Sequence, residues 1–293
     1  KMDNFAAVSE LVCLYQHLYE PSMRDHKDNQ MVQNSRKNTF LCCVTEISIV
    51  HGDIAVLNDS LKNADPCTAK GCKWPKTGKY VYVPYIISSA YSQAKRKIIL
   101  KGMESFHLST CIHFIPWTSY DHSYISFESK DGCWSFVGHQ GKRQYISLQK
   151  KACLDHGTVQ HELLHALGFH HEQCRSDRDK YVWINTKNIE PGQEGNFDKV
   201  PTNNLGTPYD FYSVMHYGKY DFSMNGQPTI VARADPNFDW GRAKHMSSND
   251  IARINKLYES FSKGPTSKPI THHFKSHNHQ MDMHYITADE LNN

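Results

Sequence analysis

The stretch that decides the fold is His161-Glu162-Leu163-Leu164-His165-Ala166-Leu167-Gly168-Phe169-His170-His171-Glu172. In a helix, His161 and His165 lie about one turn apart on the same face, so both imidazoles can bind one cation. Glu162 directly follows the first ligand, which places a carboxylate where it can take a proton from water at the metal. Gly168 can adopt the positive φ that ends a helix, and the chain can then return His171 to the metal as a third ligand.

Three neutral imidazoles leave one tetrahedral position open, which is typical of catalytic zinc and not of structural zinc. The spacing therefore predicts a catalytic site with one Zn²⁺ per chain. The chain contains 19 His and 16 Gly, so chance must be weighed. The full spacing would arise by chance in such a composition only roughly 2 times in 10,000. The alternative, histidines that merely form the polar face of a helix, is the weaker interpretation.

The composition limits the classes of protein to which this chain can belong. With 293 residues, 39% of them hydrophobic and 22% charged, the chain can bury a full core as one domain with extensions or as two small domains. The net charge of +3 is small, and Lys and Arg are spread along the chain, so we expect no nucleic-acid partner. No apolar run approaches the ~18 residues of a membrane span, so we expect no membrane partner.

The cysteines indicate an oxidising compartment. There are nine, and none forms a CxxC pair, which argues against thioredoxin-like and zinc-ribbon sites. Disulfides in a secreted, extracellular protein fit better. The N-terminal segment does not support a signal peptide, because Phe5 to Tyr15 is only weakly apolar and contains Glu10.

Periodicity predicts a strand, a helix and further strands before the histidine stretch. Alternating or β-rich segments predict strands at 80–87, 111–117, 123–127, 134–137 and 145–148. Helical spacing of apolar residues predicts a backing helix at 89–106, the histidine helix at about 157–168, and a last helix at about 247–261. Between the last two helices, Asn, Gly and Pro residues predict a loop-rich region.

The two ends of the chain are polar. Residues 1–39 are expected to pack little. An apolar run then leads to Gly52-Asp53, which predicts a turn, and Lys62 suits a trypsin-like protease. The end from Lys263 holds five histidines. They could bind metal, but a disordered end is the favoured interpretation.

Two motifs resemble the astacin family of metzincin endopeptidases. Residues 161–172 match its zinc signature HExxHxxGFxHE completely, and Ser213-Val214-Met215-His216-Tyr217 resembles its SxMHY Met-turn. The resemblance extends over about 63–260. It implies an α+β protease of two subdomains, with a twisted, mostly parallel sheet, a backing helix, the zinc-site helix and a loop-rich C-terminal subdomain that ends in a helix. It also implies that Met215 lies beneath the zinc and that Tyr217 is a mobile ligand that stabilises the transition state.

Within that family, Cys67 to Cys72, followed by Trp74 and Pro75, look most like the fish hatching-enzyme group. This suggests a Cys67–Cys72 disulfide and a mature N-terminus near Asn63. Family pairing also implies a Cys133–Cys153 disulfide.

Latency is implied by the same resemblance. Family zymogens carry an FxGD motif, and Val50-His51-Gly52-Asp53 matches it at Gly and Asp. Asp53 is therefore the candidate zymogen switch at the open zinc position, and carboxylate oxygen is an acceptable zinc ligand. After cleavage Glu172 would pair with the new N-terminal amine. The expected organisation is a propeptide at 1–62, possibly incomplete or mis-started, a catalytic domain at 63–260 and a tail at 261–293.

Two cysteines depart from the family pattern. The family usually ends with a cysteine that bonds to the one near Cys111, but Ser260 stands at that position. Cys174 stands where the family usually has Thr. A Cys111–Cys174 bond is conceivable but not favoured. Loss of the usual bond would cost stability on the order of 2 to 5 kcal/mol.

Together these features predict a secreted zinc endopeptidase made as a zymogen and activated by a trypsin-like protease. Its partner would be a protein substrate, with egg-envelope glycoproteins suggested by the group resemblance. The alternative is a secreted zinc-binding interaction protein with lost or weak catalysis, although Glu162 and Tyr217 are not needed merely to hold metal. Digestion, tissue remodelling and brood-related secretion stay open as other roles for an enzyme.

Overall fold

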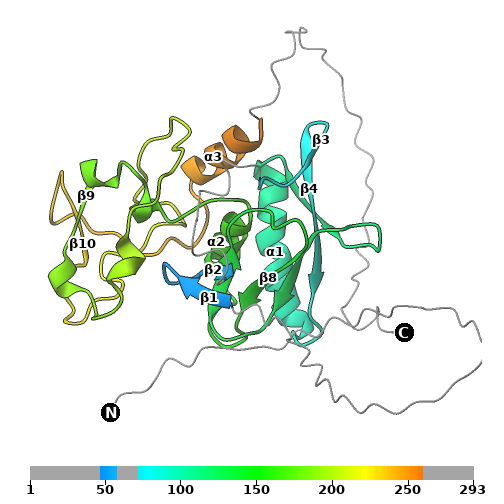
Figure 1. Cartoon of the computed structure of the whole chain (residues 1–293), viewed down its shortest axis with the longest axis horizontal. Coiled ribbons are helices and arrows are strands. Elements are labelled where there is room, and N and C mark those ends of the chain that lie inside the picture. The colour runs from blue at the N-terminus through cyan, green and yellow to red at the C-terminus, as the bar shows by residue number, and fades with distance from the viewer. Residues whose placement is uncertain (1–46, 58–71, 260–293) are drawn as a thin grey trace, which may run out of the picture.

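The computed structural model describes residues 47–57 and 72–259, and within them one large mixed sheet is backed by helices (Figure 1). The helices are α1 (Gln93–Ser109), α2 (His156–Ala166) and α3 (Ser248–Glu259). The sheet contains β1 (Ile47–Val50), β2 (Ile54–Leu57), β3 (Lys76–Thr77), β4 (Tyr80–Ile87), β5 (Ile112–Pro116), β6 (Tyr124–Glu128), β7 (Cys133–Phe136) and β8 (Arg143–Leu148).

The strand order of this sheet is β1-β2-β7-β8-β6-β4-β3, with β5 also paired to β4. Four of the seven strand pairings described in this sheet are parallel: β2 with β7, β4 with β5 and with β6, and β6 with β8. The other three, which include the β1–β2 hairpin, are antiparallel. The expected strands and helices are all present, with ends shifted by at most four residues.

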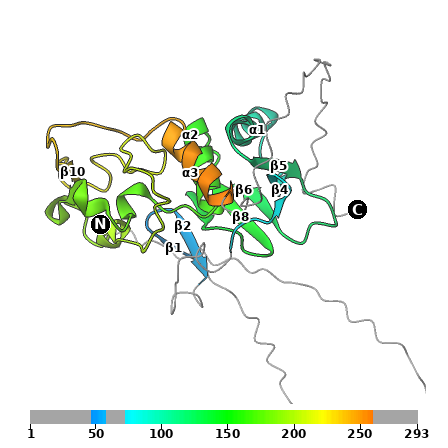
Figure 2. The ribbon, with the colours of Figure 1, turned by 90° about the horizontal axis from the view of Figure 1, so that it is seen from above.

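Helices α1 and α2 cross closely and lie on the same side of the sheet (Figure 2). Gly102 of α1 makes the crossing possible, because a Cβ built there would overlap the side chain of Val159. The main core fills the space between these helices and the sheet, and it includes fully buried Ile99, Phe106 and Leu163. Burial of this core fixes α2, and hence the histidine pair, against the sheet.

The β1–β2 hairpin forms the edge of the sheet that faces the C-terminal subdomain in both ribbon views (Figures 1 and 2). Its three-residue turn, His51 to Asp53, contains two positive φ values, 49° at His51 and 85° at Gly52. The predicted Gly52-Asp53 turn is therefore present. The hairpin thus brings residues 47–57, which are far in sequence from the histidine stretch, into the middle of the molecule.

The C-terminal subdomain is loop-rich as expected, but it also holds a two-stranded sheet that the sequence did not predict. Strand β9 (Val182–Ile184) pairs antiparallel with β10 (Ile230–Ala232). These strands and short 3-10 helices surround a second core that includes Phe197, Tyr217 and Trp240. The chain then returns to the first subdomain through α3.

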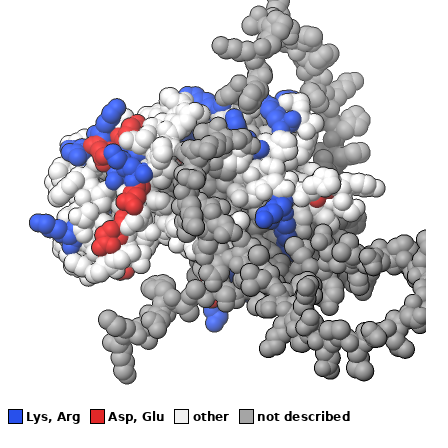
Figure 3. All heavy atoms as spheres, in the orientation of Figure 1, with Lys and Arg blue, Asp and Glu red and all other residues white. Residues whose placement is uncertain are grey.

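The surface is mixed in charge on the face drawn in Figure 3. Acidic and basic side chains lie side by side over the C-terminal subdomain. Among the described residues, no helix combines the length and apolar character needed to cross a membrane.

Candidate active site

Three imidazoles converge at one point. His161 and His165, one turn apart on α2, bring their Nε2 atoms to 3.1 Å from each other. His171 approaches from the segment after the helix, with its Nε2 at 3.2 Å from that of His161. His165 and His171 are fully buried, and His161 is partly buried. The sequence prediction of three clustered histidines therefore matches the geometry.

The end of α2 explains how His171 returns. Gly168 has φ of 105°, its N–H donates to the His165 carbonyl at 2.8 Å, and the Phe169 N–H donates to the Leu164 carbonyl at 3.0 Å. This pair of bonds is a Schellman motif, which requires a left-handed residue at the glycine position. Farther on, the Glu172 N–H donates to the Met215 carbonyl at 2.9 Å, which fixes the segment next to His171.

Backbone carbonyls orient two of the rings. His161 Nδ1 lies 2.8 Å from the Val214 carbonyl and His165 Nδ1 lies 2.7 Å from the Phe169 carbonyl. Since carbonyls accept only, each Nδ1 carries the proton and each Nε2 presents a lone pair to the centre. These two lone pairs, on Nε2 atoms only 3.1 Å apart, repel one another unless a cation lies between them. The donor set thus fits a zinc ion, which prefers imidazole nitrogen.

Asp53, from the hairpin turn, completes the cluster. Its Oδ1 lies 2.9 Å from His171 Nε2 and 3.3 Å from His165 Nε2, and its Oδ2 lies 3.1 Å from His161 Nε2. Among the described residues, these four form the one group of three or more ligand-type side chains able to hold a metal ion. Burial disfavours the charged carboxylate, yet His171 and His161 hold the pKa of Asp53 well below its ordinary value.

Glu162 is buried beside this cluster. Its Oε2 has no hydrogen-bond partner within the described part of the chain. Burial, and then the charge of Asp53, raise the pKa of Glu162 well above its ordinary value. A carboxylate with a raised pKa and an unused oxygen is suited to accept a proton.

Tyr217 contacts the hairpin turn, where its hydroxyl donates to the His51 carbonyl at 2.5 Å. Its ring centroid is 4.7 Å from that of His171. Met215 is buried in the main core, 3% exposed, in the segment directly before. Both residues of the Met-turn motif therefore lie next to the histidine cluster.

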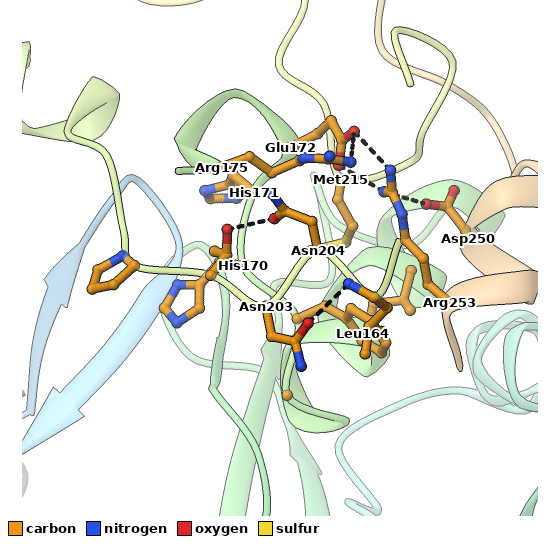
Figure 4. Close-up of a pocket in the computed structure, with 15 residues that line it drawn as sticks. Leu164, His170, His171, Glu172, Arg175, Asn203, Asn204, Met215, Asp250 and Arg253 are labelled. Atoms are coloured by element: carbon orange, nitrogen blue, oxygen red, sulfur yellow. Dashed lines mark hydrogen bonds and ion pairs between the residues drawn. The ribbon is translucent and has the colours of Figure 1, made fainter. Parts of the chain in front are cut away.

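Glu172 forms a buried ion-pair network (Figure 4). Its Oε2 accepts from Arg253 Nη1 at 2.6 Å, and its Oε1 accepts from Arg253 Nη2 at 2.8 Å and from Arg175 Nη1 at 3.1 Å. These residues line a pocket that also contacts His171 and Met215. The free N-terminal amine that the sequence analysis assigned to Glu172 would follow Lys62, and Lys62 and Asn63 lie outside the described residues.

The cysteines are only partly described. Cys133 and Cys153 form a disulfide, which ties the start of β7 to the segment before α2. Cys72 is also disulfide-bonded, but Cys67 lies outside the described residues, so that pairing stays a prediction. Cys174 is a buried free thiol and does not bond to Cys111. Ser260 lies outside the described residues as well.

Sequence reasoning missed several residues that hold the site together. Asp250, in the first turn of α3, accepts from Ser213 Oγ at 2.6 Å and from the Val214 N–H at 2.9 Å, which fixes the Met-turn. The sequence shows Asp250 near the start of the last predicted helix, but it does not show which groups donate hydrogen bonds to that carboxylate. Arg253 and His51 carried no local signal at all.

The match to known proteins agrees with this geometry. The model of the peptidase family Astacin matches residues 68–259. The chain belongs to the astacin family. It is 42% identical over 214 residues to the low choriolytic enzyme of Oryzias latipes, covering 72% of this chain and 78% of that protein. It is 44% identical over 216 residues to high choriolytic enzyme 2 of the same fish, covering 73% and 76%.

A solved structure shares the astacin fold. High choriolytic enzyme 1, described as a hatching enzyme zinc-protease from Oryzias latipes, has a TM-score of 0.64 and 46% identity, and the match covers 67% of this chain and 99% of that one. The resemblance and the α+β metzincin fold are confirmed. This astacin is a zinc metalloendopeptidase, and the Asp53 and three-histidine group supplies a site able to bind its metal ion.

Proposed function

We propose that this astacin is a secreted zymogen in which Asp53 blocks the zinc site until the hairpin is removed. The observation that carries the proposal is the position of the Asp53 carboxylate, within 2.9–3.3 Å of all three Nε2 atoms. The hairpin holds it there through β2, since the Ser135 N–H of β7 donates to the Asp53 carbonyl at 3.0 Å. A carboxylate in that place excludes both water and substrate.

His161, His165 and His171 would hold the zinc. When bound, the ion polarises the scissile carbonyl and lowers the pKa of water at the site. Glu162 would take the proton from the attacking water and deliver it to the leaving amine, for which its buried, unpartnered oxygen is suited. The Tyr217 hydroxyl, which donates to the His51 carbonyl here, would donate to the developing oxyanion once the hairpin has gone. Met215 would support the site from beneath.

Activation would follow cleavage near Lys62 by a trypsin-like protease. The organisation we propose is a propeptide at 1–62, a catalytic domain at 63–260 and a tail at 261–293. The new N-terminal amine would enter the pocket beside Glu172, whose carboxylate already accepts from two arginines. A third cationic group there would join α3 and the histidine segment to the mature N-terminus.

The substrate we propose is protein of an egg envelope. The support is the similarity to choriolytic enzymes, 42% and 44% identical, each covered over more than three quarters of its length. Secretion is supported by the Cys133–Cys153 disulfide, because such bonds persist in oxidising compartments. A Cys67–Cys72 bond would add to this.

The test is casein hydrolysis by the purified chain before and after limited trypsin treatment, beside a Glu162→Gln variant. We expect hydrolysis only after cleavage near Lys62 and only with Glu162 intact, with the variant reduced by about 10²- to 10⁴-fold. If the cleaved, zinc-loaded and folded wild type hydrolyses nothing, the chain is instead a zinc-binding interaction protein. Egg-envelope protein offered beside casein then tests the substrate.

A further inference from the structure

A small apolar cluster lies apart from the two main cores, where the hairpin pairs with β7. It consists of Trp134 and Phe136 of β7 with Tyr145 of β8, packed against Ala55, Ile47 and Leu57 of the hairpin. Trp134 and Phe136 are each only 7% exposed. Three of the six members thus belong to a segment that leaves the molecule if the proposed activation is right.

The alternation of β7 explains why two aromatic rings line one face. Ser135 between them is fully buried, so Trp134 and Phe136 point to the other side of the strand. Their ring centroids are 6.3 Å apart, edge to face. The Trp134 indole N–H donates to the Asp131 carbonyl at 3.0 Å, which satisfies its polar atom and leaves an apolar ring face.

Tyr145 is flanked by cations. Lys130 Nζ lies 4.9 Å and Arg143 Cζ lies 4.8 Å from its ring centroid. These cation–π contacts fix the ring from the solvent side and do not depend on the hairpin. The three rings therefore form a preformed surface, which we call the aromatic shelf (Trp134, Phe136 and Tyr145).

We propose that the aromatic shelf is a substrate subsite that selects large apolar side chains in an extended peptide. The inference rests on the proposed function, because it requires that the hairpin leaves and that a protein substrate takes its place. β2 shows how the occupant lies: Ile54 pairs with Ser135 and Ala55 pairs with Phe136. The side chains of β2 that contact the shelf, Ala55 and Leu57, are two residues apart.

The register places the shelf close to the reacting centre. Asp53 lies at the histidines, and the shelf contacts begin two residues farther along at Ala55. A substrate whose scissile bond lies at the zinc would therefore present alternate side chains to the shelf on one side of that bond. This alternation holds for either strand direction, since side chains of any strand alternate in facing.

The present occupant offers the shelf a small side chain. Ala55 contributes only a methyl group to this cluster, in which it is 2% exposed and Trp134 and Phe136 are each 7% exposed. A Leu or Phe in a similar position would bury more apolar area on the rings. A substrate with a large apolar side chain in this position can therefore bind the shelf more tightly than Ala55 does.

The experiment uses the trypsin-activated protein and a panel of quenched fluorescent peptides. Each peptide carries Leu or Ala at one of the four positions on either side of a single scissile bond. We expect kcat/KM to favour Leu over Ala by roughly 10- to 100-fold at positions two residues apart on one side only. In Trp134→Ala and Phe136→Ala variants that preference should fall to about threefold or less.

Tyr120→Ala, at a residue 90% exposed and outside the shelf, is the matched control and should keep the preference. A ratio of two rates in one enzyme is insensitive to partial loss of folded protein. Since the shelf is separate from the main core, both truncated variants should also retain their zinc content. An active wild type with no alternating preference, or variants that keep it, would overturn the shelf. Failure of the wild type to cut casein would instead refute the proposed function.

Discussion

Gly52 and Tyr217 are in such close contact that a Cβ added at Gly52 would lie 2.7 Å from the Tyr217 hydroxyl oxygen. The same hydroxyl donates to the carbonyl of the preceding residue, His51. Gly52 also has a φ of 85°, a backbone conformation that residues other than glycine rarely adopt. The turn that carries Asp53 to the metal site thus depends on the absence of one side chain.

Gly52→Ala should weaken latency. The clash with Tyr217 and the backbone strain, of order 1–3 kcal/mol, both act on the closed hairpin and not on the mature enzyme. We expect the uncleaved variant to hydrolyse a small peptide roughly 10-fold faster than the uncleaved wild type. Gly78→Ala is the control, because Gly78 has a φ of 60° with nothing within 4 Å of its added Cβ. Equal latency in both variants would show that the contact has no role in closure.

Removal of metal should destabilise the folded chain. Without a cation, the Nε2 atom of His161 lies only 3.1 Å from that of His165 and 3.2 Å from that of His171. Binding at a concentration 1,000 times Kd stabilises by about 4 kcal/mol, so a chelator should lower Tm by about 10 °C. Zinc added back should restore it. A His165→Ala variant that responds to chelator as strongly as the wild type would place the metal elsewhere.

Arg253→Met should be strongly destabilising. It leaves the buried Glu172 carboxylate without its bidentate partner, and breaking a buried pair in this way costs about 3–5 kcal/mol. Urea unfolding measures the loss. Lys199→Met removes one partner of the exposed pair with Asp179, 2.7 Å apart, and should change stability by less than about 1 kcal/mol. Similar losses for the two variants would argue that Glu172 is not held as described.

Acid should destabilise the fold through His216. This imidazole is buried, donates from Nδ1 to the Tyr217 carbonyl and accepts from the Tyr209 hydroxyl, and burial lowers its pKa to about 4. In the unfolded chain its pKa is near 6.5, so the unfolded state binds the proton first as pH falls. The contribution is complete above about pH 6.5 and is lost toward pH 4.

Comparison with His216→Gln isolates that contribution. Between pH 7.5 and pH 5, wild-type stability should fall by about 2 kcal/mol more than that of the variant. Urea unfolding at both pH values measures the difference. Parallel curves for the two proteins would show that the fold does not lower the pKa of His216.

Local features of the sequence predicted much of the site. Two histidines one turn apart on α2 and a glycine at its end bring His161, His165 and His171 together, and the Schellman bonds at Gly168 follow the expected pattern. The family resemblance, the fold class, the enzyme class and the zinc cofactor are confirmed. The roles of Glu162, Tyr217 and Glu172 stay predictions.

Long-range partners could not be predicted in this way. Arg253 lies 81 residues from Glu172 in sequence, and its selection as a partner depends on where α3 docks. Strands β9 and β10 are only three residues each and pair across a long loop, so neither has a periodicity to detect. The position of the hairpin on β7 likewise depends on packing of Ala55 against Trp134 and Phe136, which no local pattern encodes.

The most direct test of the account is a crystal structure of the zinc-loaded, uncleaved chain. We predict a zinc ion held by His161, His165 and His171 with an Asp53 carboxylate oxygen at about 2.0–2.2 Å from the metal. A zinc ion that carries water in that position, with Asp53 turned away and the uncleaved chain still inactive, would contradict the assignment of Asp53 as the zymogen switch.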